Sequence, residues 1–245
     1  KETFSGPLTG KNEKETYTLT REYSQDNRNL LLKETTDNGK ISTWTYLPNT
    51  HLVTSKFIQS QEKILLREFY FYDDCHNLIK TIHDDGSQKD PYDLSDVSQR
   101  TLKEYTLRQS PPFLHMPDSL EEKYVEGAQE KLLKRTLFAY DTHGNIAEEH
   151  IYGSDGAYAY TLYKTYNQRG DLLTETNPLG DQASYSYNDH GKLKTRKNFS
   201  NRLLETFAYD KKRRLIQQET FAQESGVYHT TSYDYDLQDQ LIEKI

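Results

Sequence analysis

Residues 177–193 read NPLGDQASYSYNDHGKL, in which turn-forming residues stand on either side of a short alternating segment. Tyr187 begins the second turn signal, and Gly191 and Leu193 follow it at the fourth and sixth positions. An Asp or Asn directly after the tyrosine opens a type I turn, and the glycine takes the left-handed conformation that closes a short hairpin loop. The Pro-Leu-Gly run at 178–180 is another turn signal. The stretch therefore predicts a β-strand between two tight turns.

The same unit of a tyrosine, a polar turn and an aliphatic residue six positions on recurs along the chain. We assign these copies as the corners of β-hairpins: Tyr46 as a weaker copy, Tyr72 with Asp73, Tyr140 with Asp141 and Gly144, Tyr166 with Gly170, Tyr187 with Gly191, Tyr209 with Asp210, and Tyr235 with Asp236. Tyr23 fits the unit only with one extra residue. At the corners without glycine we expect Asn, Lys, Arg or Asp to adopt the same backbone conformation.

A second turn signal lies about midway between successive corners, as in TDNG ending at Gly39 and GSDG ending at Gly156. Two turns in a repeat of about 22 residues leave two strands of roughly seven or eight residues each. Alternation supports strands, because Tyr158 and Tyr160 point to one face and polar residues fill many of the intervening positions. We expect a mainly β fold, an extended antiparallel sheet of consecutive β-hairpins that curves like a ribbon.

One interval breaks the array. Corner tyrosines are 21 to 26 residues apart except between Tyr72 and Tyr140, where the spacing is 68. Ser95 is a candidate helix cap, and Ser119 with Glu122 forms a capping box. Apolar residues follow both at roughly helical spacing: Val97, Leu102 and Tyr105 after Ser95, and Leu120, Tyr124, Ala128 and Leu132 after Ser119. We therefore predict three regions: a repeat sheet at 1–83, an α-helical insertion at 84–132, and a continuation of the same sheet at 133–245.

The insertion is interpreted as a helical plug that covers the aromatic face of the sheet, with a partner-binding lobe as the alternative. Between its two predicted helices, the run SPPFLHMP is rigid and partly apolar. We expect Phe113, Leu114 and Met116 of this run to dock on a neighbouring surface.

Composition excludes several classes of protein. The net charge of −7 and pI near 5.7 argue against a general nucleic-acid binder, and the apolar runs are too short for a membrane span. A single cysteine, Cys75, cannot form an internal disulfide framework. Hydrophobic residues make up only 33% of the chain, and 20 tyrosines are its main apolar resource.

The sequence offers little catalytic chemistry. The motifs HExxH, GxSxG, CxxC, GxGxxG and the P-loop are absent. Turn propensity explains His143 and His190, which precede glycines, better than a metal site does, and His76 beside Cys75 lacks further ligands. We expect no enzyme activity, no catalytic residue, no cofactor and no bound metal.

Charged clusters have simple explanations too. Two carboxylates at a suitable separation suffice for glycosidase chemistry, and the chain offers three acidic pairs: Asp73 with Asp74, Asp84 with Asp85, and Glu148 with Glu149. Turns and solvated strand edges account for them better. The basic clusters at 192–197 and 211–214 follow consecutive corners, and protection of strand edges explains them better than an anionic partner does.

The strings YDTHGNI at 140–146 and NPLGDQASYSYNDHGKL at 177–193 resemble the signature of the YD-repeat (Rhs repeat) family. The resemblance is strong from Tyr140 to Ile245 and weak from Thr16 to Ile82. The family includes bacterial Rhs polymorphic toxins, the B and C components of insecticidal Tc complexes, and the teneurins. In these proteins the repeats wind into a hollow β-shell that encloses a C-terminal toxic domain, or form an extracellular barrel. We find no shell-closing core segment with autoproteolytic carboxylates in this chain.

The resemblance implies a secreted or cell-surface protein that acts as a structural wall segment and encapsulates or displays a C-terminal effector. Its partners would be the remaining repeats and the effector domain of the parent chain. The alternative is a surface module that binds a glycan or a protein receptor. For that reading, Tyr158, Tyr160 and Tyr185 are the candidate ligand-contacting aromatics, because exposed aromatic rows stack on sugars.

Overall fold

The computed structural model describes residues 2–7, 14–61, 63–86, 92–93, 97, 99–126, 129–222 and 227–244. Over these residues the chain forms β-strands joined by turns and loops, without a helix, which confirms the predicted mainly β class. No helix long and apolar enough to cross a membrane occurs among them. The chain divides into two compact units: the first comprises Lys1–Arg135 and Gly153–Ala157, and the second Thr136–Tyr152 and Tyr158–Ile245.

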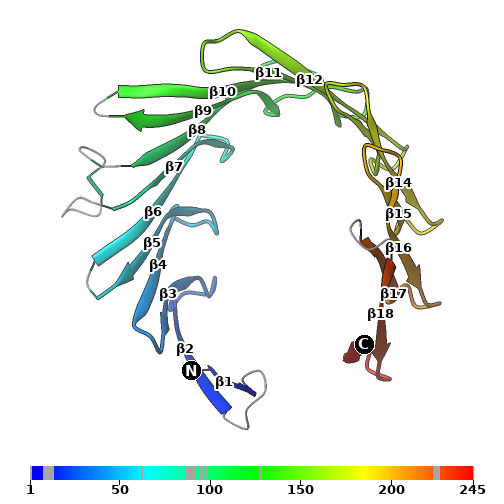
Figure 1. Ribbon diagram of the computed structural model, residues 1–245. Coiled ribbons are helices and arrows are strands. Elements are labelled where there is room, and N and C mark those ends of the chain that lie inside the picture. The colour runs from blue at the N-terminus through cyan, green and yellow to red at the C-terminus, as the bar shows by residue number, and fades with distance from the viewer. Residues whose placement is uncertain are drawn as a thin grey trace. The chain divides into compact units, whose positions relative to one another are not determined.

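In the first unit, successive strands lie side by side in chain order (Figure 1) and each pairs antiparallel with the next. The strands are β1 (Glu2–Pro7), β2 (Lys14–Tyr23), β3 (Leu31–Thr36), β4 (Lys40–Tyr46), β5 (Val53–Ser60), β6 (Lys63–Tyr72), β7 (Leu78–Asp84), β8 (Arg100–Leu107) and β9 (Pro117–Glu126). β10 (Gln129–Tyr140) pairs with β9 and passes from the first unit into the second.

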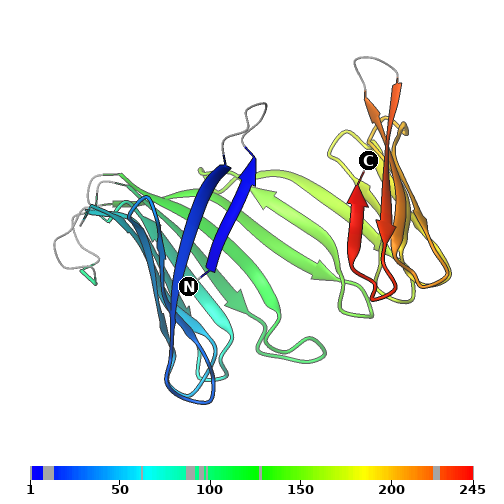
Figure 2. The same cartoon turned by 90° about the horizontal axis from the view of Figure 1, so that it is seen from below.

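The second unit continues the pattern, with each strand antiparallel to its neighbour (Figure 2). The strands are β11 (Ile146–Tyr152), β12 (Tyr158–Tyr166), β13 (Leu172–Thr176), β14 (Gln182–Tyr187), β15 (Leu193–Lys197), β16 (Leu203–Tyr209), β17 (Leu215–Ala222), β18 (Val227–Tyr235) and β19 (Leu241–Lys244). Consecutive hairpins, as predicted, build the sheet of each unit.

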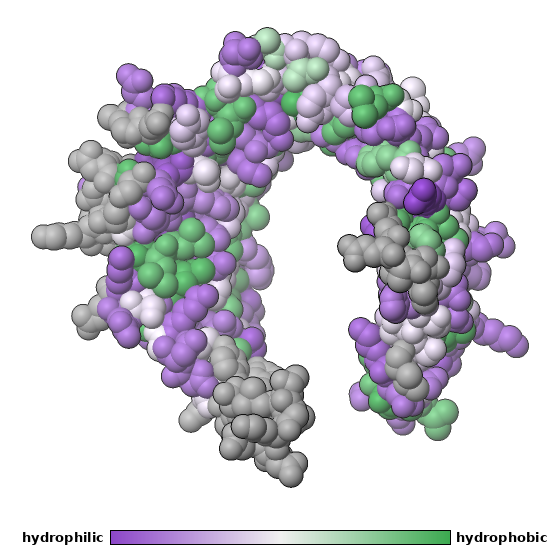
Figure 3. All heavy atoms as spheres, in the orientation of Figure 1, coloured by the Kyte–Doolittle hydropathy of each residue, from purple (hydrophilic) through white to green (hydrophobic). Residues whose placement is uncertain are grey.

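The hydrophobic core is small. In the first unit Phe57, Phe69, Ile82 and Leu102 form a buried cluster across β5 to β8, in which Ile82 lies directly opposite both Phe69 and Leu102. Among the described residues of the second unit only Ile151 and Ala183 are buried hydrophobic side chains. Hydrophilic residues occupy most of the coloured surface in Figure 3. Backbone pairing and polar contacts between strands must therefore hold much of the sheet together.

The predicted helical insertion at 84–132 is wrong. Its described residues include β8, β9 and the first part of β10, and none is helical. Ser119, expected to cap a helix, is 5% exposed in β9 and lies opposite Thr106. The reason is tertiary: β8 pairs with most of β9, from Pro117 to Tyr124, and this ladder outweighs local helix propensity. The predicted helix-stripe residue Ala128 and the predicted cap Ser95 lie outside the described residues.

The 68-residue interval contains a further corner that lacks the Tyr-Asp signature. Between β8 and β9 the N–H of Arg108 donates to the carbonyl of Met116 at 2.9 Å, and the N–H of His115 donates to Arg108 at 2.9 Å. His115 has a φ of 65°, as the closing residue of a corner requires. Leu114, expected to dock, is 46% exposed here, whereas Phe113 and Met116 are partly buried. The array continues through this interval.

Part of the β7–β8 connection packs against the sheet, although it is not helical. The ring of Tyr92 packs edge-on against Phe57, with 5.3 Å between the ring centroids, and the carbonyl of Asp93 accepts a hydrogen bond from Arg67 at 2.8 Å. Val97 is 8% exposed. Tyr92 and Asp93 of the β7–β8 connection thus lie on the sheet face that carries the buried cluster.

Candidate functional site

The corner at Tyr140 shows the local chemistry of the repeat. The N–H of Asp141 donates to the carbonyl of Asn145 at 2.9 Å, and the N–H of Gly144 donates to the carbonyl of Asp141 at 3.2 Å. The Asp141 carboxylate accepts the N–H groups of His143 and Asn145 at 2.8 and 2.9 Å. One side chain therefore satisfies two backbone donors that the ladder leaves without a strand partner.

Other turns use the same arrangement with Asp or Asn in the first position. The side-chain oxygen accepts the N–H groups two and four residues on at Asp73, Asn167, Asn188 and Asp236, and at the far ends of the strands at Asn177 and Asn198. A hydrogen bond from the Asn77 side chain holds the pKa of Asp73 below its ordinary value, and Asn145 does the same for the pKa of Asp141. These carboxylates are parts of turns.

A residue of positive φ closes each corner. Gly144, Gly170 and Gly191 provide it in three corners. In the corners without glycine the same conformation is held at φ between 62° and 67° by Asn49, His76, Arg213 and Asp239. The residue types expected there, Asn, Arg and Asp, occur at three of the four positions, and the corner at Tyr72 uses histidine instead.

The hydroxyl of a corner tyrosine reaches the neighbouring strand. Tyr187 donates a hydrogen bond to the carbonyl of Leu172 at 2.8 Å, and Leu172 is the aliphatic residue six positions after the preceding corner tyrosine, Tyr166. We call this hydrogen bond the tyrosine latch. Six latches are present in the described part of the chain, at 2.7 to 2.9 Å: Tyr46 to Leu31, Tyr72 to Val53, Tyr166 to Ile146, Tyr187 to Leu172, Tyr209 to Leu193, and Tyr235 to Leu215.

The latch lies where backbone pairing has stopped. Pairing of β13 with β14 begins at Thr174 opposite Ser184, two residues inward from Leu172 and three from Tyr187. The same offsets hold at all six latches. The hydroxyl thus bonds a carbonyl that the ladder does not pair. Burial raises the pKa of five of the six latch tyrosines: Tyr46, Tyr72, Tyr166, Tyr187 and Tyr209. Each latch closes the end of a hairpin opposite its turn.

Of the candidate ligand-contacting aromatics, the structure brings two together. Tyr158 and Tyr160 line a hollow of about 350 Å³ beside the turn that begins at Asn177, and Tyr163 joins them. Tyr185 does not line this hollow and lies in β14 opposite Arg196. Strict alternation puts Tyr158 and Tyr160 on one face and Tyr163 on the other. This is wrong, because a bulge between Tyr158 and Tyr160 places Tyr158 on the face of Tyr163 and leaves Tyr160 on the opposite face.

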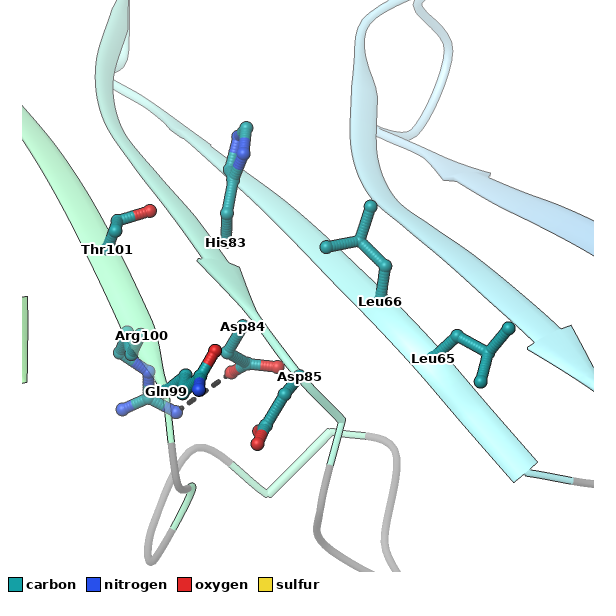
Figure 4. A pocket seen from close by; sticks show the side chains of 8 residues that line it. All are labelled: Leu65, Leu66, His83, Asp84, Asp85, Gln99, Arg100 and Thr101. Atoms are coloured by element: carbon teal, nitrogen blue, oxygen red, sulfur yellow. Dashed lines mark hydrogen bonds and ion pairs between the residues drawn. The ribbon is translucent and has the colours of Figure 1, made fainter.

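A buried ion cluster borders another pocket, of about 280 Å³, which Figure 4 shows. Arg67 and Asp84, each with a fully buried side chain, form two hydrogen bonds at 2.7 and 3.0 Å, and Arg100 points at the same carboxylate at 3.1 Å. Burial would raise the pKa of Asp84, but the hydrogen bonds from the two arginines hold it below its ordinary value. Because Arg67 also binds the carbonyl of Asp93, the cluster attaches the β7–β8 connection to the sheet.

The acidic pair in β11 has structural partners as well. Glu148 contacts His150 at 3.2 Å and Glu149 pairs with Lys164. His143 and His190 are exposed turn residues, and Cys75 is exposed in the corner at Asp73. In the described residues no group of three or more His, Cys, Asp or Glu side chains could hold a metal ion.

Three cations of the two basic clusters have carboxylate partners. Arg196 pairs with Glu205 at 2.8 Å. Arg214 pairs with Asp210 at 2.6 Å and with Asp239 at 2.7 Å, and Lys212 also contacts Asp239 at 2.7 Å. Arg196 is thus paired across the ladder with Glu205 of β16, and Arg214 is paired with its own corner and with the corner at Asp236.

Comparison with known proteins identifies the fold. No family model and no curated protein matches the chain. Among solved structures, a chain of the Photorhabdus luminescens Tc holotoxin pore matches 87% of this chain with a TM-score of 0.58 and 15% identity. The crystal structure of TcdB2-TccC3-TEV matches 94% of it with a TM-score of 0.53 and 16% identity. This chain has the fold of a segment of these Tc toxin chains.

The segment is short. It spans about 12% of the length of each of the two Tc toxin chains. The resemblance to the YD-repeat family, which includes Tc components, is confirmed in the fold.

Proposed function

We propose that this chain is a non-catalytic segment of a β-sheet wall in a secreted or surface-associated protein, and that the wall encloses or displays a C-terminal effector of the parent chain. The tyrosine latch carries this proposal. It joins consecutive corners at the place where the ladder opens, so the sheet can lengthen by adding repeats, each of which contacts only its neighbours. A wall needs this property more than it needs a large hydrophobic core.

The comparisons support a role as one segment among many, because the chain shares its fold with about 12% of each Tc toxin chain. Sequestration would be the mechanism: paired strands leave few edges for proteases, and the wall separates the effector from its surroundings. A non-catalytic role is supported by Asp73, Asp84 and Glu149, whose carboxylates are engaged in a turn or in ion pairs.

The experiment uses the natural polypeptide that contains this sequence, isolated with an antibody raised against the 245-residue chain. We expect a polypeptide several times larger than 28.8 kDa, with a C-terminal domain that resists limited proteolysis until the wall is unfolded. Replacing Tyr187, Tyr209 and Tyr235 together by Phe should speed cleavage, whereas Tyr185→Phe should not. The proposal is overturned if the natural polypeptide has a mass of only 28.8 kDa, or if the protease cleaves its C-terminal domain as fast as it cleaves the same domain separated from the wall.

A surface-binding module is the second candidate function. The hollow at Tyr158, Tyr160 and Tyr163 favours it, because monomeric proteins rarely keep large aromatic groups exposed together without a use.

A further inference from the structure

β12 is longer than the strand that follows it. It pairs with β13 only from Tyr163 to Tyr166, so residues 158–162 extend past Thr176, where β13 ends. The turn that begins at Asn177 lies beside this overhang and completes the hollow of about 350 Å³. The unequal strand lengths therefore create the space, and every residue that lines it belongs to the second unit.

The ring of Tyr158 is exposed and yet held in place. It is 59% exposed, but its hydroxyl bonds Thr161 Oγ1 at 3.0 Å, and Thr161 is 6% exposed. Thr161 also contacts His150 Nδ1 at 2.8 Å. On another side the ring meets Tyr152 edge-on, with 5.8 Å between the centroids. A fixed ring offers a flat surface without the entropy cost of ordering a free side chain on binding.

Two further rings supply unused polar groups. Tyr160 and Tyr163 are 38% and 48% exposed. Within the described residues neither hydroxyl has a hydrogen-bond partner. Because β12 is bulged between Tyr158 and Tyr160, Tyr163 lies on the same face of the strand as Tyr158, and Tyr160 lies on the opposite face. The hydroxyl of Tyr163 is thus available to donate to, or accept from, a ligand that lies against the Tyr158 ring.

The lining carries no charge. Its nine residues are Tyr158, Ala159, Tyr160, Thr161, Tyr163, Thr176, Asn177, Pro178 and Gly180, although 28% of the whole chain is charged. An ionic ligand would lose hydration without gaining an opposite charge, so the site disfavours it. A purely apolar ligand would leave the tyrosine hydroxyls unpaired.

We propose that this hollow binds a neutral sugar, a hexopyranose unit of a glycan. The apolar C–H face of a pyranose ring lies on the fixed Tyr158 ring, and a sugar hydroxyl bonds the hydroxyl of Tyr163, which lies on the same face of β12. The lining combines aromatic rings with hydroxyl and amide groups, which suits a sugar, because a pyranose has an apolar face and a polar rim. The inference is independent of the wall function, because none of these tyrosines forms a latch.

Saturation-transfer NMR on the complete 245-residue chain tests the site, with D-glucose, D-galactose, N-acetyl-D-glucosamine and their neutral tetrasaccharides as probes. We expect at least one neutral probe to bind. Tyr158→Ala should weaken that binding about tenfold through loss of the ring contact. Tyr158→Phe keeps the ring but loses the bond to Thr161, so it should weaken binding less.

Tyr228→Ala is the matched control. Tyr228 is 47% exposed and also packs on an aromatic neighbour, Phe221, at 5.1 Å between centroids, but it lies outside the hollow. Its removal should leave binding unchanged. Tyr163→Ala repeats the test if Tyr158→Ala fails to fold. The proposal is overturned if no neutral probe binds, if D-glucuronate or D-glucosamine binds more tightly than the neutral sugars, or if the control weakens binding as much as the site variant. Such a failure leaves the protease experiment on the wall unaffected.

Discussion

The hydroxyl of Tyr187 donates a hydrogen bond to the carbonyl of Leu172 at 2.8 Å, two residues beyond Thr174, where pairing of β13 with β14 begins. Leu172 opens the strand after one corner, and Tyr187 ends the strand before the next. The bond therefore ties consecutive corners together. Six such bonds recur with identical offsets in register, and in four of them the acceptor is the aliphatic residue six positions after the preceding corner tyrosine. In those four, the tyrosine and the aliphatic residue of the repeat act as donor and acceptor of one interaction.

The first prediction concerns this bond. Tyr187→Phe keeps the ring and removes only the donor, so the free energy of unfolding should fall by about 1 kcal/mol. For a chain of this size that loss lowers Tm by about 2–4 °C. Tyr185→Phe is the control, since Tyr185 lies two residues away in the same strand and forms no latch. Equal shifts for both variants in thermal unfolding would show that the latch contributes nothing.

The second prediction is a loss of stability in alkali. Burial raises the pKa of the latch tyrosines Tyr166, Tyr187 and Tyr209 above 10.0, and it raises that of Tyr70, together with a hydrogen bond to Glu68, to about 12. Below the ordinary pKa these groups keep their protons in both states, so stability should not change. As the pH rises from about 10 through the folded pKa, only the unfolded chain releases protons freely, and stability falls. Urea midpoints measured across this range should drop, and drop less steeply when Tyr166, Tyr187 and Tyr209 are replaced by Phe.

The third prediction separates the hydrogen bonds of a corner from its charge. Asn167 and Asn188 fill the role of Asp141 in other corners, so Asp141→Asn should preserve the turn, whereas Asp141→Ala should destabilise the chain. The side-chain amide of Asn145 lowers the pKa of Asp141 below 3.8 in the folded state. The stability that this shift contributes is present above pH 3.8 and is lost as the pH falls through the folded pKa. Urea midpoints should therefore fall less in acid for Asp141→Asn than for the natural chain.

The sequence predicts the corners well because their chemistry is local. Tyr140, Asp141 and Gly144 meet within a few residues of one another, and the turn needs nothing from the rest of the chain. The latch is different. Its donor and acceptor are 15 to 20 residues apart, and only the register of the hairpin between them brings them together.

The prediction of helices at 84–132 is wrong for a related reason. Leu120 and Tyr124 fit helical spacing, but they also lie on one face of a strand, because four is a multiple of the strand period of two. The corner at Arg108–Met116 has neither tyrosine nor aspartate at its start, so no repeat signal marked it. His115 closes this corner with a positive φ, but histidine in a sequence does not predict that conformation as glycine does. The hollow at Tyr158 likewise depends on unequal strand lengths, which composition does not reveal.

The fourth prediction concerns the buried ion cluster. Asp84→Leu leaves the guanidinium groups of Arg67 and Arg100 buried without their carboxylate, and should cost about 3–5 kcal/mol of unfolding free energy. Arg67→Met should cost less, because Arg100 remains as a partner for Asp84. Urea unfolding of the two single variants and of Arg67→Met combined with Asp84→Leu measures the coupling. Additive losses in the double variant would show that the pair does not interact energetically.

The fifth prediction tests the backbone of a corner. Gly144 has a φ of 87°, a conformation that an alanine Cβ opposes, so Gly144→Ala should destabilise the chain by about 1–2 kcal/mol. Asn49 and Asn201 hold the same region at 62° and 56°, because a short amide side chain can bond locally and offset part of the strain. Gly144→Asn should therefore lower the free energy of unfolding, measured in urea, clearly less than Gly144→Ala does. The converse change, Asn49→Gly, relieves the strain at its own corner and should be neutral or slightly stabilising. If Ala and Asn at position 144 were equally costly, the left-handed conformation would not be what limits the residue choice there.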